Sequence, residues 1–141
     1  MPGGQGRGGQ TVTGGARGIG EAIARCFVRE GAAVIIADID VEAGQRVAKD
    51  IGGSFFELDV ASEGGWESLA TAHPSIDIVV NNAGITGFEA SPGPHDPEHA
   101  SLTKLHRVHA VTLAGCFLGC RYAINAINAN GTGAILNLSS P

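Results

Sequence analysis

The stretch TVTGGARGIG, residues 11–20, decides the fold. Its glycines Gly14, Gly18 and Gly20 follow a G-x-x-x-G-x-G spacing between a short candidate strand and an apolar-periodic candidate helix. Glycines allow a tight turn there, and they let backbone N–H groups approach a pyrophosphate at the helix N-terminus. The stretch therefore predicts a nucleotide-binding turn, although a plain strand-to-helix turn would also account for the glycines.

The next apolar run, AVIIA at residues 33–37, leads directly into Asp38, which lies 18 residues after Gly20. A carboxylate at this place can accept both hydroxyls of an adenine ribose, and it would repel a 2′-phosphate. Asp38 therefore predicts NAD as the cofactor in preference to NADP. Arg17, inside the glycine loop, is the one feature that favours the phosphate, and we interpret it as a solvent-facing loop residue.

Outward from the glycine loop, strand and helix patterns alternate along the whole chain. Strands are expected at 10–13, 33–37, 54–58, 77–80 and 134–138, helices at 19–30, 41–51, 66–72 and 102–129, and a loop at 84–100. Periodicity predicts the inward residues of the first and last helices, namely Ile19, Ala22, Ile23, Cys26 and Phe27, and Leu105, Val108, Leu113, Cys116, Phe117 and Cys120. The alternation predicts an α/β fold with a doubly wound parallel sheet.

Composition narrows the class of protein. The chain has 141 residues, is 43% hydrophobic and carries a net charge of −5, so we expect one domain and no nucleic-acid partner. No apolar run reaches membrane-spanning length and the N-terminus has no secretory h-region, so we expect a cytoplasmic protein without a membrane partner. Residues 1–9 are glycine-rich and are expected to form a disordered lead-in, with the domain at 10–141.

The residues with metal-binding chemistry do not form a convincing pattern. Cys26, Cys116 and Cys120 contain no C-x-x-C pair, and we interpret them as small core residues. His95 and His99 have a suggestive spacing, but the intervening Pro97 would break the helix that such a pair needs. The sequence therefore predicts no metal site.

The sequence resembles the N-terminal part of a classical short-chain dehydrogenase/reductase. The motifs that carry the resemblance are residues 13–20 (TGGARGIG), Asp38, Asp59-Val60, residues 81–84 (NNAG) and residues 133–140 (GAILNLSS). The resemblance implies a Rossmann-like fold and hydride transfer between a nicotinamide cofactor and a secondary alcohol or ketone. It implies cofactor-binding roles for Gly14, Arg17, Gly18, Ile19, Gly20, Asp38, Asp59, Val60, Asn82, Ala83 and Gly84, and a role for Ser140 at the substrate oxygen.

Three features depart from the family pattern. The family's Tyr-x-x-x-Lys acid/base segment is absent, and its helix asparagine is replaced by Thr112. The first strand is also polar and glycine-rich, so it supplies little packing. We therefore expect an incomplete domain that stops after the fifth strand and is inactive alone. A parent enzyme, a non-catalytic NAD-binding fragment and a non-functional remnant remain alternatives, and self-association through the 102–129 helix is plausible.

Overall fold

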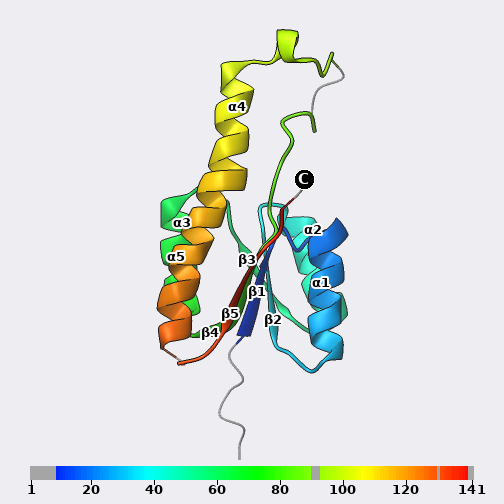
Figure 1. Cartoon of the computed structure of the whole chain (residues 1–141). Helices are drawn as coiled ribbons and strands as arrows, with labels where there is room; N and C mark the ends of the chain where they lie inside the picture. Colours follow the sequence, from blue (N-terminus) through cyan, green and yellow to red (C-terminus); the bar gives the residue numbers. More distant parts are fainter. Residues whose placement is uncertain (1–8, 90–92, 130, 140–141) are drawn as a thin grey trace, which may run out of the picture.

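The computed structural model describes residues 9–89, 93–129 and 131–139. Within these residues, five strands form one all-parallel sheet in the order β3-β2-β1-β4-β5, with helices on both faces (Figure 1). The strands are β1 Gly9–Thr13, β2 Val34–Asp38, β3 Ser54–Glu57, β4 Ile76–Asn81 and β5 Ala134–Asn137. This arrangement confirms the predicted doubly wound sheet. Residues 1–8 of the expected lead-in lie outside the described residues, whereas Gly9 already belongs to β1.

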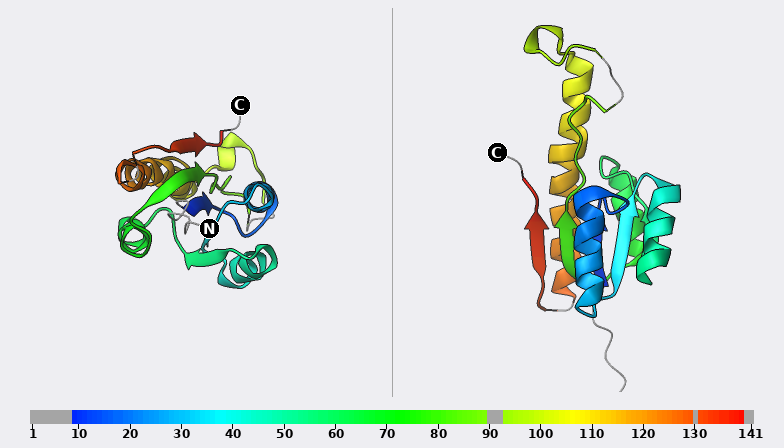
Figure 2. Two further views of the ribbon diagram at one scale, coloured as in Figure 1. Left: turned by 90° about the horizontal axis from the view of Figure 1, so that it is seen from below. Right: turned by 90° about the vertical axis from the view of Figure 1, so that its right-hand side faces the viewer.

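Helices cover both faces of the sheet (Figure 2). Helices α1 Gly18–Arg29 and α2 Val41–Ile51 cover one face, and α3 Glu63–Ala72 and α5 Gly115–Asn128 cover the other. Strand β2 supplies both cores, because alternate residues point to opposite faces. Val34 and Ile36 belong to the α1–α2 core with Val12, Ala24, Val47, Ala48 and Val80. Ile35 and Ala37 belong to the α3–α5 core with Leu58, Trp66, Leu69, Val79, Leu118 and Tyr122.

The first strand lies at the centre of the sheet despite its polar sequence. Val12 packs fully buried into the α1–α2 core, and Thr13 is buried as well. The Thr13 hydroxyl donates to the Val80 carbonyl at 3.3 Å and accepts from two backbone N–H groups that follow β4. Thr13 therefore joins β1 to β4 through hydrogen bonds where the sequence predicted only weak packing.

The long predicted helix consists of three segments in continuous succession. These are α4 Leu102–Val108, a π-helical segment η2 His109–Ala114, and α5. Only α5 packs on the sheet, while α4 projects beyond it (Figure 1). Before α4, Pro97–His99 forms the short 3₁₀ helix η1.

The predicted inward face of this helix is wrong at three residues. Leu105, Leu113 and Phe117 are largely exposed, and the buried residues are Gly115, Leu118, Gly119, Tyr122, Ala123 and Ala126. The physical reason is that small residues meet the sheet. Gly115 lies against Val60 and Gly119 against Asn81, at distances that leave no room for a side chain.

The same correction applies to α1. Its buried residues are Gly20 and Ala24, and Ile23 and Phe27 are half-buried beside them. Ile19, Ala22 and Cys26 are exposed, contrary to the prediction. Small residues on the contact face let α1 approach the sheet closely, which moves the larger apolar residues toward its flanks.

The segment Leu102–Asn128 is 27 residues long and contains an 18-residue stretch with a mean hydropathy of 1.4, so by length and composition alone it could cross a membrane. This corrects the expectation that no segment reaches that length. Its C-terminal half forms part of the α3–α5 core, and core helices of soluble proteins share this composition. Length and composition are therefore weak evidence for a membrane role.

Candidate nucleotide-binding site

The candidate site lies at the carboxyl ends of β1, β2 and β4. The chain turns sharply after β1, where Gly14 has a φ of 64° and donates its N–H to the Ala37 carbonyl at 2.8 Å. A Cβ at Gly14 would lie 3.0 Å from the Ala83 Cα, so the loops after β1 and β4 touch. This edge of a parallel sheet is where α/β proteins bind their ligands.

Two polar side chains hold the glycine loop in place. The Thr13 hydroxyl accepts from the N–H groups of Asn82 and Ala83, both at 3.0 Å. The Asn82 amide donates to the carbonyls of Thr13 at 3.0 Å and Gly14 at 3.2 Å. Asn82 and Ala83 therefore support the loop from the side of the sheet, which leaves the loop's other side for a ligand.

The start of α1 differs from the starts of α2, α3 and α4, whereas α5 has no separate start because it continues directly from η2. Helices α2, α3 and α4 are each capped by a side chain, from Asp40, Ser62 and Ser101. Helix α1 begins after Arg17 with no side-chain cap. Its first N–H groups are therefore available to an anion, which the helix dipole also favours.

The glycines at this helix start fit a bound pyrophosphate. Gly18 has a φ of 57° and open space where a Cβ would lie, with nothing within 4 Å. Gly20 lies under the loop, and a Cβ there would be 2.2 Å from the Gly14 carbonyl oxygen. The neighbouring Ile19 side chain is exposed. The glycine loop thus lies directly against the start of α1 at Gly20, while the outer side of the loop at Gly18 has space for a ligand.

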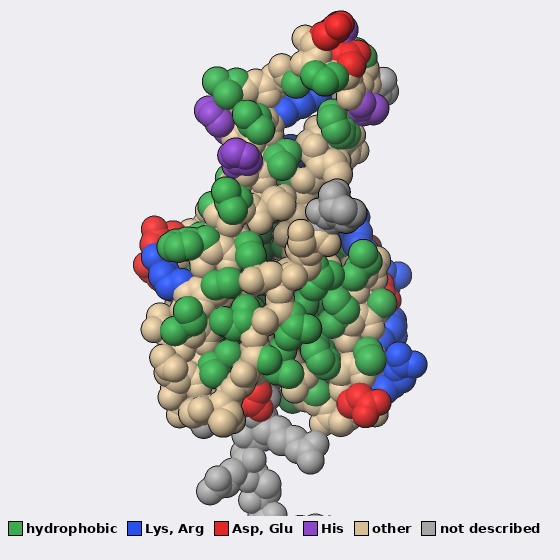
Figure 3. Space-filling view, in the orientation of Figure 1, with side chains coloured by type: hydrophobic (Ala, Val, Ile, Leu, Met, Phe, Trp, Pro, Cys, Tyr) green, Lys and Arg blue, Asp and Glu red, His purple; other side chains and the backbone are tan. Residues whose placement is uncertain are grey.

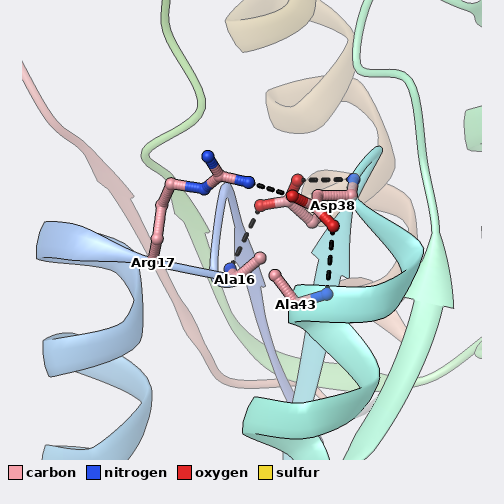
Figure 4. A network of polar contacts seen from close by, with 5 residues as sticks. Ala16, Arg17, Asp38 and Ala43 are labelled. Carbon is pink, nitrogen blue, oxygen red and sulfur yellow. Dashed lines mark hydrogen bonds and ion pairs between the residues drawn. The ribbon is translucent and has the colours of Figure 1, made fainter.

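Asp38 ends β2 and faces the glycine loop (Figure 4). One carboxylate oxygen accepts the Ala16 N–H at 3.1 Å, and the other accepts the Asp40 N–H at 2.9 Å. Each oxygen of a carboxylate has a further lone pair, so Asp38 can still accept hydroxyl groups. Its position across from the loop fits the ribose role that the sequence predicts.

Arg17 is exposed, as interpreted from the sequence, and it pairs with Asp40 (Figure 4). The other Asp40 oxygen caps α2 by accepting the Ala43 N–H at 3.0 Å. Arg17 is the only arginine in the glycine loop. Its guanidinium pairs with the Asp40 carboxylate and is therefore already occupied.

The residues after β3 and β4 lie around the same edge of the sheet. Val60 is buried against Gly115 of α5, and Asp59 is exposed with one oxygen accepting the Ala61 N–H at 2.9 Å. Gly84 is exposed and lies 3.7 Å, measured from a built Cβ, from the Thr112 hydroxyl. All the predicted cofactor residues therefore lie along one edge of the sheet, Asp38 at the end of β2 and the others in the loops and at the start of α1.

Thr112 lies in the π-helical segment, and its hydroxyl meets both the N–H and the carbonyl of Ile85 at 3.4 Å. The helix therefore contacts the loop after β4 at the position where the family has an asparagine. Segments of π-helix often occur at functional sites. Ser140, the predicted catalytic serine, lies outside the described residues.

The loop between β4 and α4 has its own local order. The rings of Phe88 and His95 pack edge to face, with centroids 4.4 Å apart. Glu89 accepts hydrogen bonds from the backbone of Thr86 and Gly87, which lower its pKa to about 2. These contacts fold the loop on itself near the end of β4.

Three side chains with metal-ligand atoms lie close together in this loop, and they include His99 but not His95. Asp96, Glu98 and His99 each place one ligand atom within 4.8 Å of the others. All three side chains are exposed, and Asp96 already caps η1 and pairs with His99. Clusters of this kind are common on surfaces without a metal.

Sequence reasoning missed the role of Thr13 as the residue that ties the glycine loop to the segment after β4. The available signal was a threonine at the end of a central strand, directly before the turn glycine. Sequence reasoning also did not predict that four side chains lie in contact at the ends of β4 and β5. They are Asn81, Cys116, Cys120 and Asn137.

A doubly wound parallel sheet with an uncapped, glycine-lined helix start is the arrangement with which α/β proteins bind nucleotides. A family model described as Enoyl-(Acyl carrier protein) reductase matches residues 14–141. The chain belongs to the short-chain dehydrogenase/reductase family.

Several curated relatives are similar across 92% of this chain. Borneol dehydrogenase of Lavandula x intermedia is 37% identical over 133 residues, and 3-alpha-(or 20-beta)-hydroxysteroid dehydrogenase of Mycobacterium tuberculosis is 36% identical over 135 residues. NADP-dependent (R)-specific alcohol dehydrogenase of Lentilactobacillus kefiri is 38% identical over 138 residues. The matches cover 50%, 50% and 52% of these relatives, so the chain spans about half their length.

Proposed function

We propose that this chain is the cofactor-binding part of an oxidoreductase that transfers hydride between a nicotinamide cofactor and a secondary alcohol or ketone. The observation that carries the proposal is the uncapped start of α1, lined by Gly14 and Gly18 and facing Asp38. Its free N–H groups suit a pyrophosphate, and Asp38 suits an adenine ribose. The relatives include a hydroxysteroid dehydrogenase and an alcohol dehydrogenase, which supports the same chemistry.

The bound cofactor would supply the hydride chemistry, and this chain's residues would position it. The loop at 14–20 and the start of α1 would hold the pyrophosphate, and Asp38 the ribose. Asp59 and Val60 would border the adenine, and Gly84 would line the adenosine side. Ser140 would bind the substrate oxygen in a parent enzyme.

NAD is the cofactor we propose, in preference to NADP. A 2′-phosphate on the ribose would meet the Asp38 carboxylate, with Asp40 directly beyond it. Arg17, whose positive charge would otherwise attract such a phosphate, is paired with Asp40. The alcohol dehydrogenase of Lentilactobacillus kefiri is named as NADP-dependent, so NADP is the alternative that an experiment must exclude.

A non-catalytic NAD-binding role for the 141 residues alone has its own support. The sequence contains one tyrosine, Tyr122, and its hydroxyl donates to the His73 carbonyl at 2.9 Å within the α3–α5 core. Burial raises the pKa of Tyr122, which keeps it protonated. A buried and occupied hydroxyl is not available for proton transfer to a substrate. We therefore propose that these residues bind NAD without turnover.

Calorimetric titration with NAD and NADP tests the proposal. We expect the chain to bind NAD more tightly than NADP, and Asp38→Asn to weaken NAD binding about tenfold or more through lost charge-assisted hydrogen bonds. The same variant should narrow the difference between the two cofactors. Asp50→Asn, which changes an exposed carboxylate on α2, is the matched control and should bind NAD as the unmodified chain does. Equal affinity for both cofactors in the unmodified chain would refute the NAD preference.

We also propose that the chain self-associates through the exposed face of α4, η2 and α5. Leu102, Leu105, Leu113, Phe117 and Ile124 are all exposed, and a shallow hollow lined by His106, His109, Ala110, Leu113, Ala114 and Phe117 runs along this face. Histidine and hydrophobic side chains gather on the projecting upper part of the molecule (Figure 3). Exposed apolar patches of this kind mark interaction sites, and a second copy offers a matching apolar face.

A further inference from the structure

Two of the three cysteines face each other one helical turn apart on α5. Cys116 and Cys120 are half-buried, and their thiols interact with each other. The third cysteine, Cys26, is exposed on α1 on the opposite face of the sheet. The pair lies near the carboxyl ends of β4 and β5, beside the predicted site but not part of it.

Both sulfur atoms converge on one oxygen atom. The side-chain oxygen Oδ1 of Asn137, the last residue of β5, lies 3.4 Å from the Cys116 sulfur and 3.6 Å from the Cys120 sulfur. The Asn81 amide fixes that oxygen by donating to it at 2.8 Å. Asn81 itself is buried, and its amide also lies 3.5 Å from the Cys120 sulfur as a donor. The ends of β4 and β5 therefore hold the two thiols and an amide oxygen around one point.

The separation of Cys116 and Cys120 on the helix shows whether a disulfide or a bound metal ion fits the pair better. Residues four apart on a helix have Cβ atoms about 5–6 Å apart, whereas a disulfide needs about 3.5–4.5 Å. A disulfide would therefore distort α5 where it packs on the sheet. A metal ion bonded to both sulfur atoms holds them farther apart than a disulfide bond does, so it spans the longer separation without such distortion. The geometry thus favours an inserted soft ion over direct oxidation.

We propose that Cys116 and Cys120 form a two-thiolate site that binds one Cu(I) ion, with the Asn137 oxygen beside it. Soft thiolate ligands select Cu(I), and two thiolates complete the linear coordination that this ion accepts. Both thiols lose a proton and two S–Cu bonds form, so copper remains Cu(I) and no electron is transferred. The N–H of Asn81 stabilises the negative charge on the Cys120 sulfur.

Metal binding at this pair depends on pH, because both thiols must lose a proton to become ligands. Metal ions displace such protons, and their affinity falls as the pH decreases. Copper uptake should therefore release protons and weaken in acid.

The test is an anaerobic Cu(I) competition titration of the whole 141-residue chain against bicinchoninate. We expect one Cu(I) per chain, and Cys26→Ser should retain the full affinity. Cys116→Ser and Cys120→Ser should each lose more than about a hundredfold, which exceeds the loss typical for residues outside the ligand set. Asn137→Ala should lose about ten- to a hundredfold.

A second measurement uses the unmodified chain, so it tests the proposal even where a serine variant fails to fold. In the unmodified chain, Cu(I) should protect Cys116 and Cys120, but not Cys26, from alkylation by N-ethylmaleimide, as mapped by peptide mass spectrometry. Protection of Cys26, or equal loss of affinity in all three serine variants, would overturn the proposal. So would an intact mass showing that the pair forms a disulfide and retains no copper.

Discussion

At the scale of single residues, Thr13 links the candidate site to the fold. Its hydroxyl satisfies the N–H groups of Asn82 and Ala83 at the edge of the glycine loop. We expect Thr13→Val, which preserves the shape, to leave these donors without their acceptor and to lower the free energy of unfolding by about 1–3 kcal/mol. Urea denaturation measures this change, and NAD titration should show weaker binding because the loop is less ordered.

Thr71→Val provides the matched control for that substitution. Thr71 is exposed on α3, and its hydroxyl donates to the Glu67 carbonyl at 2.9 Å within the same helix. Surface changes of this kind alter stability by less than about 0.5 kcal/mol. If both threonine variants lost the same stability, the Thr13 hydroxyl would not have the linking role that its contacts indicate.

At the scale of elements, close contact between α5 and β4 depends on glycine. A Cβ at Gly119 would lie 1.9 Å from the Asn81 side-chain oxygen, so α5 or Asn81 must move to accept it. We expect Gly119→Ala to lower the free energy of unfolding by about 1–3 kcal/mol, in spite of the higher helix propensity of alanine. Thermal or urea unfolding measures the effect.

The opposite sign is expected at Gly64 in α3. A Cβ there meets nothing within 4 Å, and the residue is exposed. Gly64→Ala should therefore raise the free energy of unfolding by about 0.4–1 kcal/mol, because alanine restricts the unfolded chain. Stabilisation by Gly119→Ala as well would show that α5 is not held closely against Asn81.

The contrast between these elements also shows what the sequence could predict. The glycine loop and Asp38 were predictable because local motifs determine a turn, a helix start and a strand end. The inward face of α5 was not, because periodicity identifies large apolar residues while Gly115, Gly119 and Ala123 make the contact. The Thr13 hydrogen bonds and the Cys116–Asn137 contact join residues far apart in the sequence, so no local pattern reveals them.

At the scale of the whole molecule, the long helix has an apolar face that a monomer would leave exposed to water. Phe117 is 64% exposed and Leu113 is 65% exposed, one turn apart on this face. We expect Phe117→Lys to shift the chain toward the monomer in sedimentation velocity, because a charge at the centre of an apolar contact must be desolvated. Ile39→Lys changes a residue that is 66% exposed on the loop after β2, and it should leave the association unchanged. Association that persists in Phe117→Lys, or that is lost equally in both variants, would place the contact between copies on another surface.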